Sequence, residues 1–150
     1  MNRMLPLLLT ACVVGPGNEQ IVLEADFDRF VEEVQPILSS TCANPACHGS
    51  GDRPLELYAV HQHRLDPDDV WADTPLTTAE LYLNFHRSCG FLLDLDQPKD
   101  CELVRKPLSV TAGGLHHQGG DQFNDRDNPD YLAILDWIGS IDTPQMEGPQ

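Results

Sequence analysis

Basic residues are scarce in this sequence. Its 150 residues include nine lysines and arginines against 24 aspartates and glutamates, which gives a formal net charge of −15 at pH 7. Nucleic-acid binding needs a basic surface that neutralises phosphates, so we expect no nucleic-acid partner. The acidity fits a well-solvated domain outside the cytoplasm, and its field would steer basic partners toward it.

Catalytic signatures, long apolar runs and central methionines are also missing. Neither G-x-S-x-G nor H-E-x-x-H occurs, and there is no internal repeat, so we do not expect an enzyme. The apolar run Leu5–Leu9 is far shorter than the roughly 20 residues of a transmembrane helix. The three methionines are Met1, Met4 and Met146, which leaves none in the middle of the chain.

The N-terminus carries the features of an export signal. Arg3 precedes the apolar run, and small residues lead to Cys12. The segment MNRMLPLLLTAC resembles a bacterial lipoprotein signal, in which the cysteine becomes the lipid-bearing first residue of the mature chain. This resemblance implies a lipid anchor on Cys12 and an exported lipoprotein, periplasmic or at the cell surface, with the outer membrane as its expected location. The alternative is an inefficient export signal interrupted by its proline.

The five cysteines divide into groups. If Cys12 carries lipid, four remain, and an oxidising compartment favours pairing them or binding them to a cofactor. Cys89 and Cys101 flank the segment GFLLDLDQPKD, which a disulfide would close. The sequence therefore predicts a Cys89–Cys101 bridge.

The segment STCANPACHG places Cys42, Cys47 and His48 in a C-x4-C-H pattern, two residues longer than the C-x-x-C-H of haem attachment. Three interpretations remain open: covalent haem, a disulfide between the two cysteines, or a zinc site completed by a distant histidine. Haem would need a second axial ligand. Because no usable methionine is present, the best-placed candidates are His116 and His117, which lie between glycine pairs.

Three helices are expected. The first begins near Asp26 and follows an apolar i, i+3, i+4 pattern, with a kink or a new turn at Pro36. The second covers Thr77–Arg87. The third is capped by Asn128 and ends at Gly139. No strand alternation is evident, so the fold class is mainly α with long loops.

The chain divides into a signal peptide over residues 1–11, an irregular tether over 12–25, one domain over 26–140 and a mobile tail over 141–150.

Two stretches together carry a family resemblance. FDRFVEEVQPILSSTCANPACHG, followed by LVRKPLSVTAGGLHHQGGDQF and NPDYLAILDWI, resembles the single-haem cytochrome c domains in exported proteins of planctomycetes and myxobacteria. It covers roughly residues 27–50 and 103–138, and the spacing of the cysteines is its main departure. The resemblance implies a small cytochrome c-like domain in which the first and last helices pack on each other beside one haem.

The same resemblance assigns the site residue by residue. Cys42 and Cys47 correspond to the haem thioether positions, His48 to the proximal iron ligand and His117 to the distal one, with His116 as the alternative. The implied protein is a lipid-anchored cytochrome with one bis-histidine haem c, which carries single electrons between redox partner proteins. The alternatives are a haem-free, disulfide-stapled lipoprotein acting as an interaction module, and a haem protein whose labile distal ligand admits a small molecule.

Overall fold

The structure is a computed structural model that describes residues 11–14 and 21–141, with side chains from Ala25 onward. The expected signal peptide, the side chain of Cys12 and nearly all of the expected tail lie outside the described residues. The chain is mainly helical, as the sequence predicts. The elements are β1 (Ala11–Val14), β2 (Ile21–Glu24), α1 (Phe27–Arg29), η1 (Phe30–Val34), α2 (Gln35–Ile37), η2 (Leu38–Cys42), η3 (Pro67–Trp71), α3 (Thr78–Cys89), η4 (Pro98–Asp100), α4 (Glu102–Arg105), η5 (Val110–Ala112) and α5 (Pro129–Gly139).

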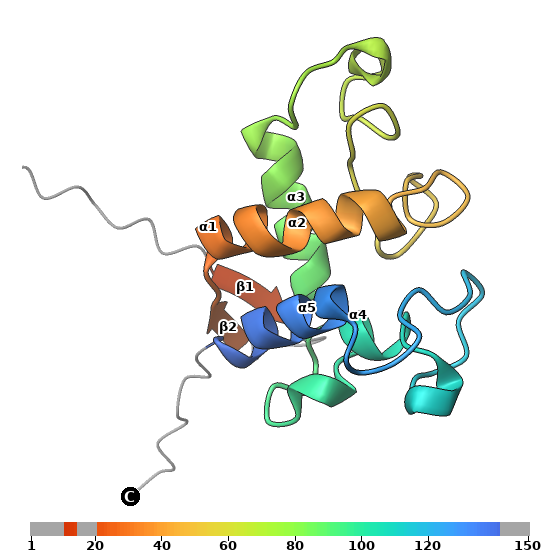
Figure 1. Ribbon diagram of the computed structural model, residues 1–150. Helices are drawn as coiled ribbons and strands as arrows, with labels where there is room; N and C mark the ends of the chain where they lie inside the picture. The colour runs from red at the N-terminus through yellow and green to blue at the C-terminus, as the bar shows by residue number, and fades with distance from the viewer. Residues whose placement is uncertain (1–10, 15–20, 142–150) are drawn as a thin grey trace, which may run out of the picture.

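The two strands form an antiparallel hairpin that the sequence analysis did not expect. Ala11 pairs with Glu24 and Val14 with Ile21, and β1 lies against α3 (Figure 1). The structure therefore places strands in a segment predicted to be an irregular tether. Each strand has four residues, too few to show a clear alternation in the sequence, and only their pairing makes them recognisable.

The first helix runs from Phe27 to Cys42 without a break, through α1, η1, α2 and η2 (Figure 1). Two of its segments, η1 and η2, are π-helical, and the N–H of Gln35 donates to the carbonyl of Phe30, five residues earlier. This wider turn accommodates Pro36, which has no N–H to donate. The helix thus continues through the proline and carries the chain directly to Cys42.

Helix α3 begins with a reciprocal cap. The hydroxyl of Thr77 accepts from the N–H of Glu80, and the Glu80 carboxylate accepts from the N–H of Thr77, so the predicted start is confirmed. The helical spacing predicts that Leu81, Tyr82 and Phe85 face inward. Phe85 is fully buried and Leu81 partly buried, but Tyr82 is 39% exposed. Tyr82 instead lies at the edge of the core, where its ring contacts that of Phe27.

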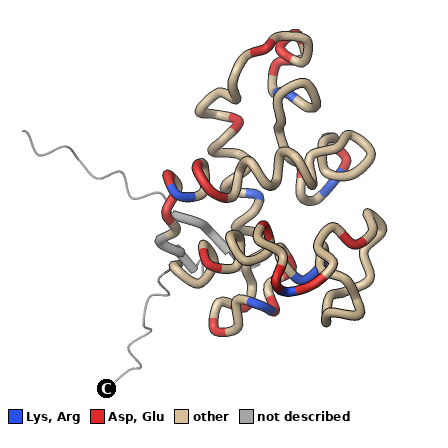
Figure 2. Tube along the Cα trace, in the orientation of Figure 1, with Lys and Arg blue, Asp and Glu red and all other residues tan. Residues whose placement is uncertain are grey.

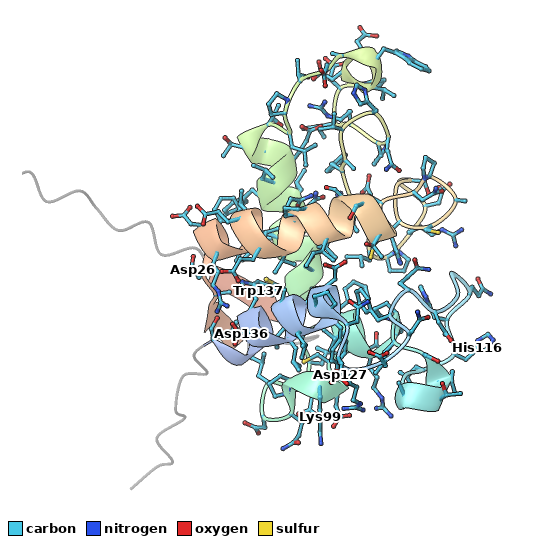
Figure 3. The ribbon with its side chains drawn as sticks, viewed as in Figure 1. Asp26, Lys99, His116, Asp127, Asp136 and Trp137 are labelled. Atoms are coloured by element: carbon cyan, nitrogen blue, oxygen red, sulfur yellow. The ribbon has the colours of Figure 1, made fainter. Side chains whose placement is uncertain are left out.

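Helix α5 packs on the first helix. Its first N–H groups donate to the Asn128 side chain. The apolar spacing predicts a buried face of Tyr131, Ile134, Leu135 and Ile138, of which Leu135 is only partly buried and the other three are buried. Trp137 is also buried, and its indole N–H donates to the carbonyl of Asp26 at 3.2 Å (Figure 3). The first and last helices therefore form a packed pair, as the family resemblance implies.

Candidate functional site

A cavity of about 610 Å³ lies at one end of this helix pair. The loop that follows η2 and the loop that follows η5 extend from the same side of the molecule and border it (Figure 1). Apolar side chains from both loops and from the helices form much of the lining. They are Leu38, Leu55, Phe91, Leu103, Phe123 and Ile134. The volume and the apolar lining are those of a site for a medium-sized organic ligand.

The C-x4-C-H segment forms a compact loop around Asn44. The Asn44 side chain accepts from the N–H of Ala46 at 2.9 Å, and its carbonyl accepts from the N–H of Cys47 at 2.7 Å. The N–H of His48 donates to the carbonyl of Cys42 at 3.1 Å and closes the loop. The additional residues between the cysteines are therefore part of a hydrogen-bonded turn, and both thiols and the histidine still border the same cavity.

Gly49 allows this turn to close. A Cβ at position 49 would lie 2.0 Å from the carbonyl oxygen of Ala43, a distance that no side chain can occupy. The glycine N–H also donates to the Asn44 carbonyl at 3.0 Å. The residue after His48 must therefore be a glycine for the loop to keep this shape.

His48 is held at two points. Its Nδ1–H donates to the carbonyl of Leu55 at 2.8 Å, and its own carbonyl accepts from the N–H of Leu57 at 2.7 Å. Because a carbonyl can only accept, the ring hydrogen is on Nδ1 and Nε2 keeps its lone pair. Burial lowers the pKa of His48, which outweighs the opposing effect of the Leu55 hydrogen bond. The ring is thus a neutral imidazole available to a metal.

Glycines also position His117. A Cβ on Gly114 would lie 1.8 Å from the carbonyl oxygen of Leu108, and one on Gly119 would lie 2.8 Å from Cε1 of the His117 ring. Gly120 has a φ of +77°, and its carbonyl accepts from Nδ1–H of His117 at 3.3 Å. The glycines that bracket the histidines in the sequence therefore do allow the close approaches expected of them.

The two histidines meet across the cavity. Their ring centroids are 5.9 Å apart and their planes are within 7° of parallel. Within the described residues neither ring has a hydrogen bond at Nε2, and both use Nδ1 for a backbone carbonyl. Two metal–imidazole bonds of about 2 Å each, with the distance from each nitrogen to its ring centre added, give a separation of about 6 Å. The observed separation matches this value, and a metal ion would bind both rings where the in-plane lone pairs of the two Nε2 atoms are directed at the space between them.

His116, the alternative ligand, is exposed and lies at the outer edge of the molecule (Figure 3). His117 is partly buried. Of the two neighbours, only His117 has its ring beside that of His48.

Cys42 and Cys47 both carry free thiols and both line the cavity. Burial raises the pKa of Cys42 to about 12, with a further contribution from Cys47, so this thiol is protonated at neutral pH. The structure does not join the two sulfurs, in contrast to the disulfide interpretation. Among the residues that the structure describes, no three His, Cys, Asp or Glu side chains are grouped as a metal site.

The predicted Cys89–Cys101 bridge is not formed. Cys101 carries a free, buried thiol, which donates to the carbonyl of Asp94 at 3.2 Å. Burial raises the pKa of this thiol. The prediction considered only the length of the loop between the cysteines, whereas a bridge also requires the two sulfurs to point toward each other. The folded loop directs the Cys101 sulfur to its own backbone instead.

The sequence analysis missed two basic residues of the site. Arg53 and Lys106 line the cavity, and their charges contribute to the low pKa of His48. Lys106 also lies 2.8 Å from the Glu102 carboxylate and 5.7 Å from the centre of the Phe91 ring. The sequence has only nine basic residues, and two of them border this one cavity. The scarcity of basic residues was thus the signal that could have drawn attention to these two.

The described part of the chain contains no helix long and apolar enough to cross a membrane. Comparison with known proteins gives no match to a family model, to a curated protein or to a solved structure.

Proposed function

We propose that this chain is a c-type cytochrome that carries single electrons on one covalently bound haem c. The observation that supports the proposal most strongly is the His48–His117 pair, with parallel rings 5.9 Å apart across a cavity that two free thiols also line. When bound, haem supplies a reversible one-electron couple at its iron. Because the porphyrin brings four nitrogen ligands of its own, two protein ligands are sufficient.

The chain's own residues would hold the group in three ways. Cys42 and Cys47 would attach it through thioethers, and His48 and His117 would ligate the iron through Nε2. The Leu55 carbonyl orients His48, as carbonyl and carboxylate partners do for most metal-binding histidines. The apolar lining would exclude water from the porphyrin faces.

Electron transfer is favoured over catalysis by the ligand set. If His48 and His117 both held the iron, no position on it would be open to a substrate, which favours an electron carrier over an enzyme. Two imidazoles also give a lower reduction potential than the His/Met pair, because a thioether ligand raises it. The alternative is a haem protein in which His117 leaves the iron and a small ligand takes its place. A high-spin visible spectrum of the wild-type protein would distinguish this alternative from the electron carrier.

The proposed location and partners rest on the sequence. A lipid on Cys12 would anchor the domain to a membrane, most plausibly the outer membrane, with the protein exported to the periplasm or the cell surface. Its partners would be redox proteins. The net charge of −15 would steer basic partners toward it.

The decisive experiment is expression of the full chain with c-type maturation machinery, followed by visible spectroscopy and intact mass measurement. We expect a low-spin haem spectrum and the added mass of one haem. Covalent attachment should be lost when both site thiols are removed in Cys42→Ser/Cys47→Ser. Cys101→Ser is the matched control, because it removes a free thiol outside the cavity and should keep the haem.

A colourless wild-type protein with Cys42 and Cys47 oxidised to each other would contradict the proposal. That result would favour the haem-free, disulfide-stapled lipoprotein, which would then serve as an interaction module.

A further inference from the structure

A lobe formed by residues 61–77 projects from the helical body (Figure 1). Trp71, at the end of the short helix η3, is 89% exposed, and Leu65 in the same lobe is 53% exposed. Exposed tryptophan is unusual, since burial of its large apolar surface is favourable. Tryptophan is also among the residues that contribute most binding energy in protein interfaces.

Buried polar contacts fix the conformation of the lobe, so Trp71 is exposed on an ordered segment. Arg64 is only 3% exposed, and its guanidinium forms an ion pair with the buried Glu80 at 2.9 Å. The same guanidinium donates to the carbonyls of Thr74 and Pro75, both at 3.1 Å. One buried cation therefore connects both ends of the lobe to α3. A surface held in its final conformation loses less entropy on binding.

A hollow in the same lobe is bordered by the exposed Leu65. Its volume is about 290 Å³, and it is lined by Leu65, Pro67 and Thr77 together with the carboxylates of Asp66, Asp69 and Glu80. Glu80 is already occupied by Arg64. Asp69 lies 3.9 Å from the same guanidinium but keeps 39% of its side chain exposed, and Asp66 is exposed. Acidic positions also cluster at the tip of the lobe (Figure 2). The hollow thus combines an apolar wall with available negative charge.

We propose that this lobe is a docking surface for a basic protein partner, which inserts an arginine or lysine side chain into the hollow and packs against Trp71. The aliphatic stem of such a side chain matches Leu65 and Pro67, and its cation matches Asp66 and Asp69. The Trp71 face offers a further contact for a cation. The inference does not depend on haem, because the lobe lies apart from the residues that line the candidate haem cavity.

The test uses the full chain and a synthetic peptide of four Arg-Ala-Leu repeats, with the Gln-Ala-Leu peptide as its uncharged counterpart. Because Trp137 is buried, a change in tryptophan emission on binding reports mainly on Trp71, and calorimetry gives the affinity of each variant independently. We expect saturable 1:1 binding of the arginine peptide alone. Trp71→Ala should weaken it at least tenfold, and Asp66→Asn/Asp69→Asn at least fivefold.

Two controls separate docking from general attraction to an acidic protein. Asp96→Asn/Asp121→Asn removes the same charge from exposed positions outside the lobe, and Leu132→Ala removes an apolar side chain that is 46% exposed on α5. Both should keep the wild-type affinity within twofold. The proposal is overturned if wild type shows no saturable binding, if the glutamine peptide binds equally, if Trp71→Ala falls short of the tenfold loss, or if the charge control weakens binding as much as the lobe pair.

Discussion

Two adjacent histidines have very different surroundings in this protein. His117 lies over Gly119 with its ring parallel to that of His48, whereas His116 is exposed at the rim of the same cavity. In the haem-loaded protein, we therefore expect His117→Ala to convert the low-spin spectrum almost completely to a high-spin one that binds carbon monoxide or added imidazole. His116→Ala, the matched control, should leave the spectrum unchanged. The reverse result would show that the distal ligand is the neighbouring residue.

Gly49 provides a test that does not require haem. Its substitution by alanine would place a methyl group against the backbone of Ala43, which cannot move without opening the Cys42–His48 turn. We expect Gly49→Ala to lower the free energy of unfolding by at least about 1–3 kcal/mol, the usual range for overpacking. Chemical denaturation monitored by circular dichroism measures this change.

Gly139 is the control for that substitution. A methyl group there would meet none of the described residues within 4 Å, and the glycine is the last residue of a helix. Gly139→Ala should be neutral or stabilising by up to about 1 kcal/mol, because alanine is the better helix former. Equal destabilisation by both substitutions would contradict the role assigned to Gly49.

For single residues, the sequence predicts which side chains could form a site better than it predicts what those side chains contact. Cys47 and His48 were recognisable from their adjacency, and the structure brings them to one cavity with His117. The state of Cys101 was predicted wrongly, since the direction of a sulfur depends on how its loop folds. Lys106 was missed, because its place beside the cavity depends on contacts distant in the sequence.

Among the elements, α3 and the lobe before it depend on one buried carboxylate. Burial alone would raise the pKa of Glu80, but hydrogen bonds from Arg64, Leu65 and Thr77 outweigh it and lower the pKa from 4.5 to about 2. A carboxyl group with a lowered pKa stabilises the fold fully above its unfolded value, near pH 4.5, and loses this contribution as the pH falls toward 2.

We therefore expect an acid-dependent loss of stability between pH 4.5 and pH 2. The part due to Glu80 should be on the order of 3 kcal/mol. Urea unfolding at a series of pH values measures the slope. Glu80→Gln should remove this part of the slope, and at neutral pH it should cost about 3–5 kcal/mol because Arg64 is left buried without its partner. An unchanged acid slope in Glu80→Gln would show that other carboxylates are responsible.

Helix boundaries were predictable where the signals are local. Thr77 and Asn128 cap their helices through side-chain contacts with residues two or three positions away, so the sequence contains the whole cause. The passage of the first helix through Pro36 was not predictable in the same way. It depends on π turns, which packing against α5 supports and which have no clear sequence signature.

In the whole molecule, repulsion among the acidic side chains that give the net charge of −15 lowers the stability of the folded state, and salt should weaken this repulsion. Raising NaCl from about 10 mM to about 150 mM shortens the Debye length from about 30 Å to about 8 Å. We expect the melting temperature at neutral pH to rise by about 2–4 °C, the equivalent of roughly 1 kcal/mol for a domain of this size. Differential scanning calorimetry measures it.

A charge variant serves as the control for this effect. Asp96→Lys/Asp121→Lys changes two exposed positions by two charges each and raises the formal net charge from −15 to −11. It should show a higher melting temperature at low salt and a smaller increase with salt. A melting temperature that falls as salt is added would mean that surface ion pairs outweigh the repulsion.

The fold class follows from the sequence, but the arrangement of the parts does not. Apolar periodicity predicts mainly helical structure, and the described residues confirm it. The β1–β2 hairpin, the projecting lobe and the cavity between two loops all arise from contacts between distant segments. Such contacts leave no periodic signal in a single sequence.

The two hydrogen bonds that fix His48 would affect the rate of electron transfer. Its side chain and its backbone carbonyl are both bonded to the segment 55–57, so the imidazole cannot rotate without breaking the Leu55 bond, and the whole residue cannot retreat without also breaking the Leu57 bond. In the proposed cytochrome, a ligand fixed in this way would keep the same position in both oxidation states. Little nuclear rearrangement would then accompany each electron, so the reorganisation energy at the proximal side would be low and the exchange of electrons fast in both directions.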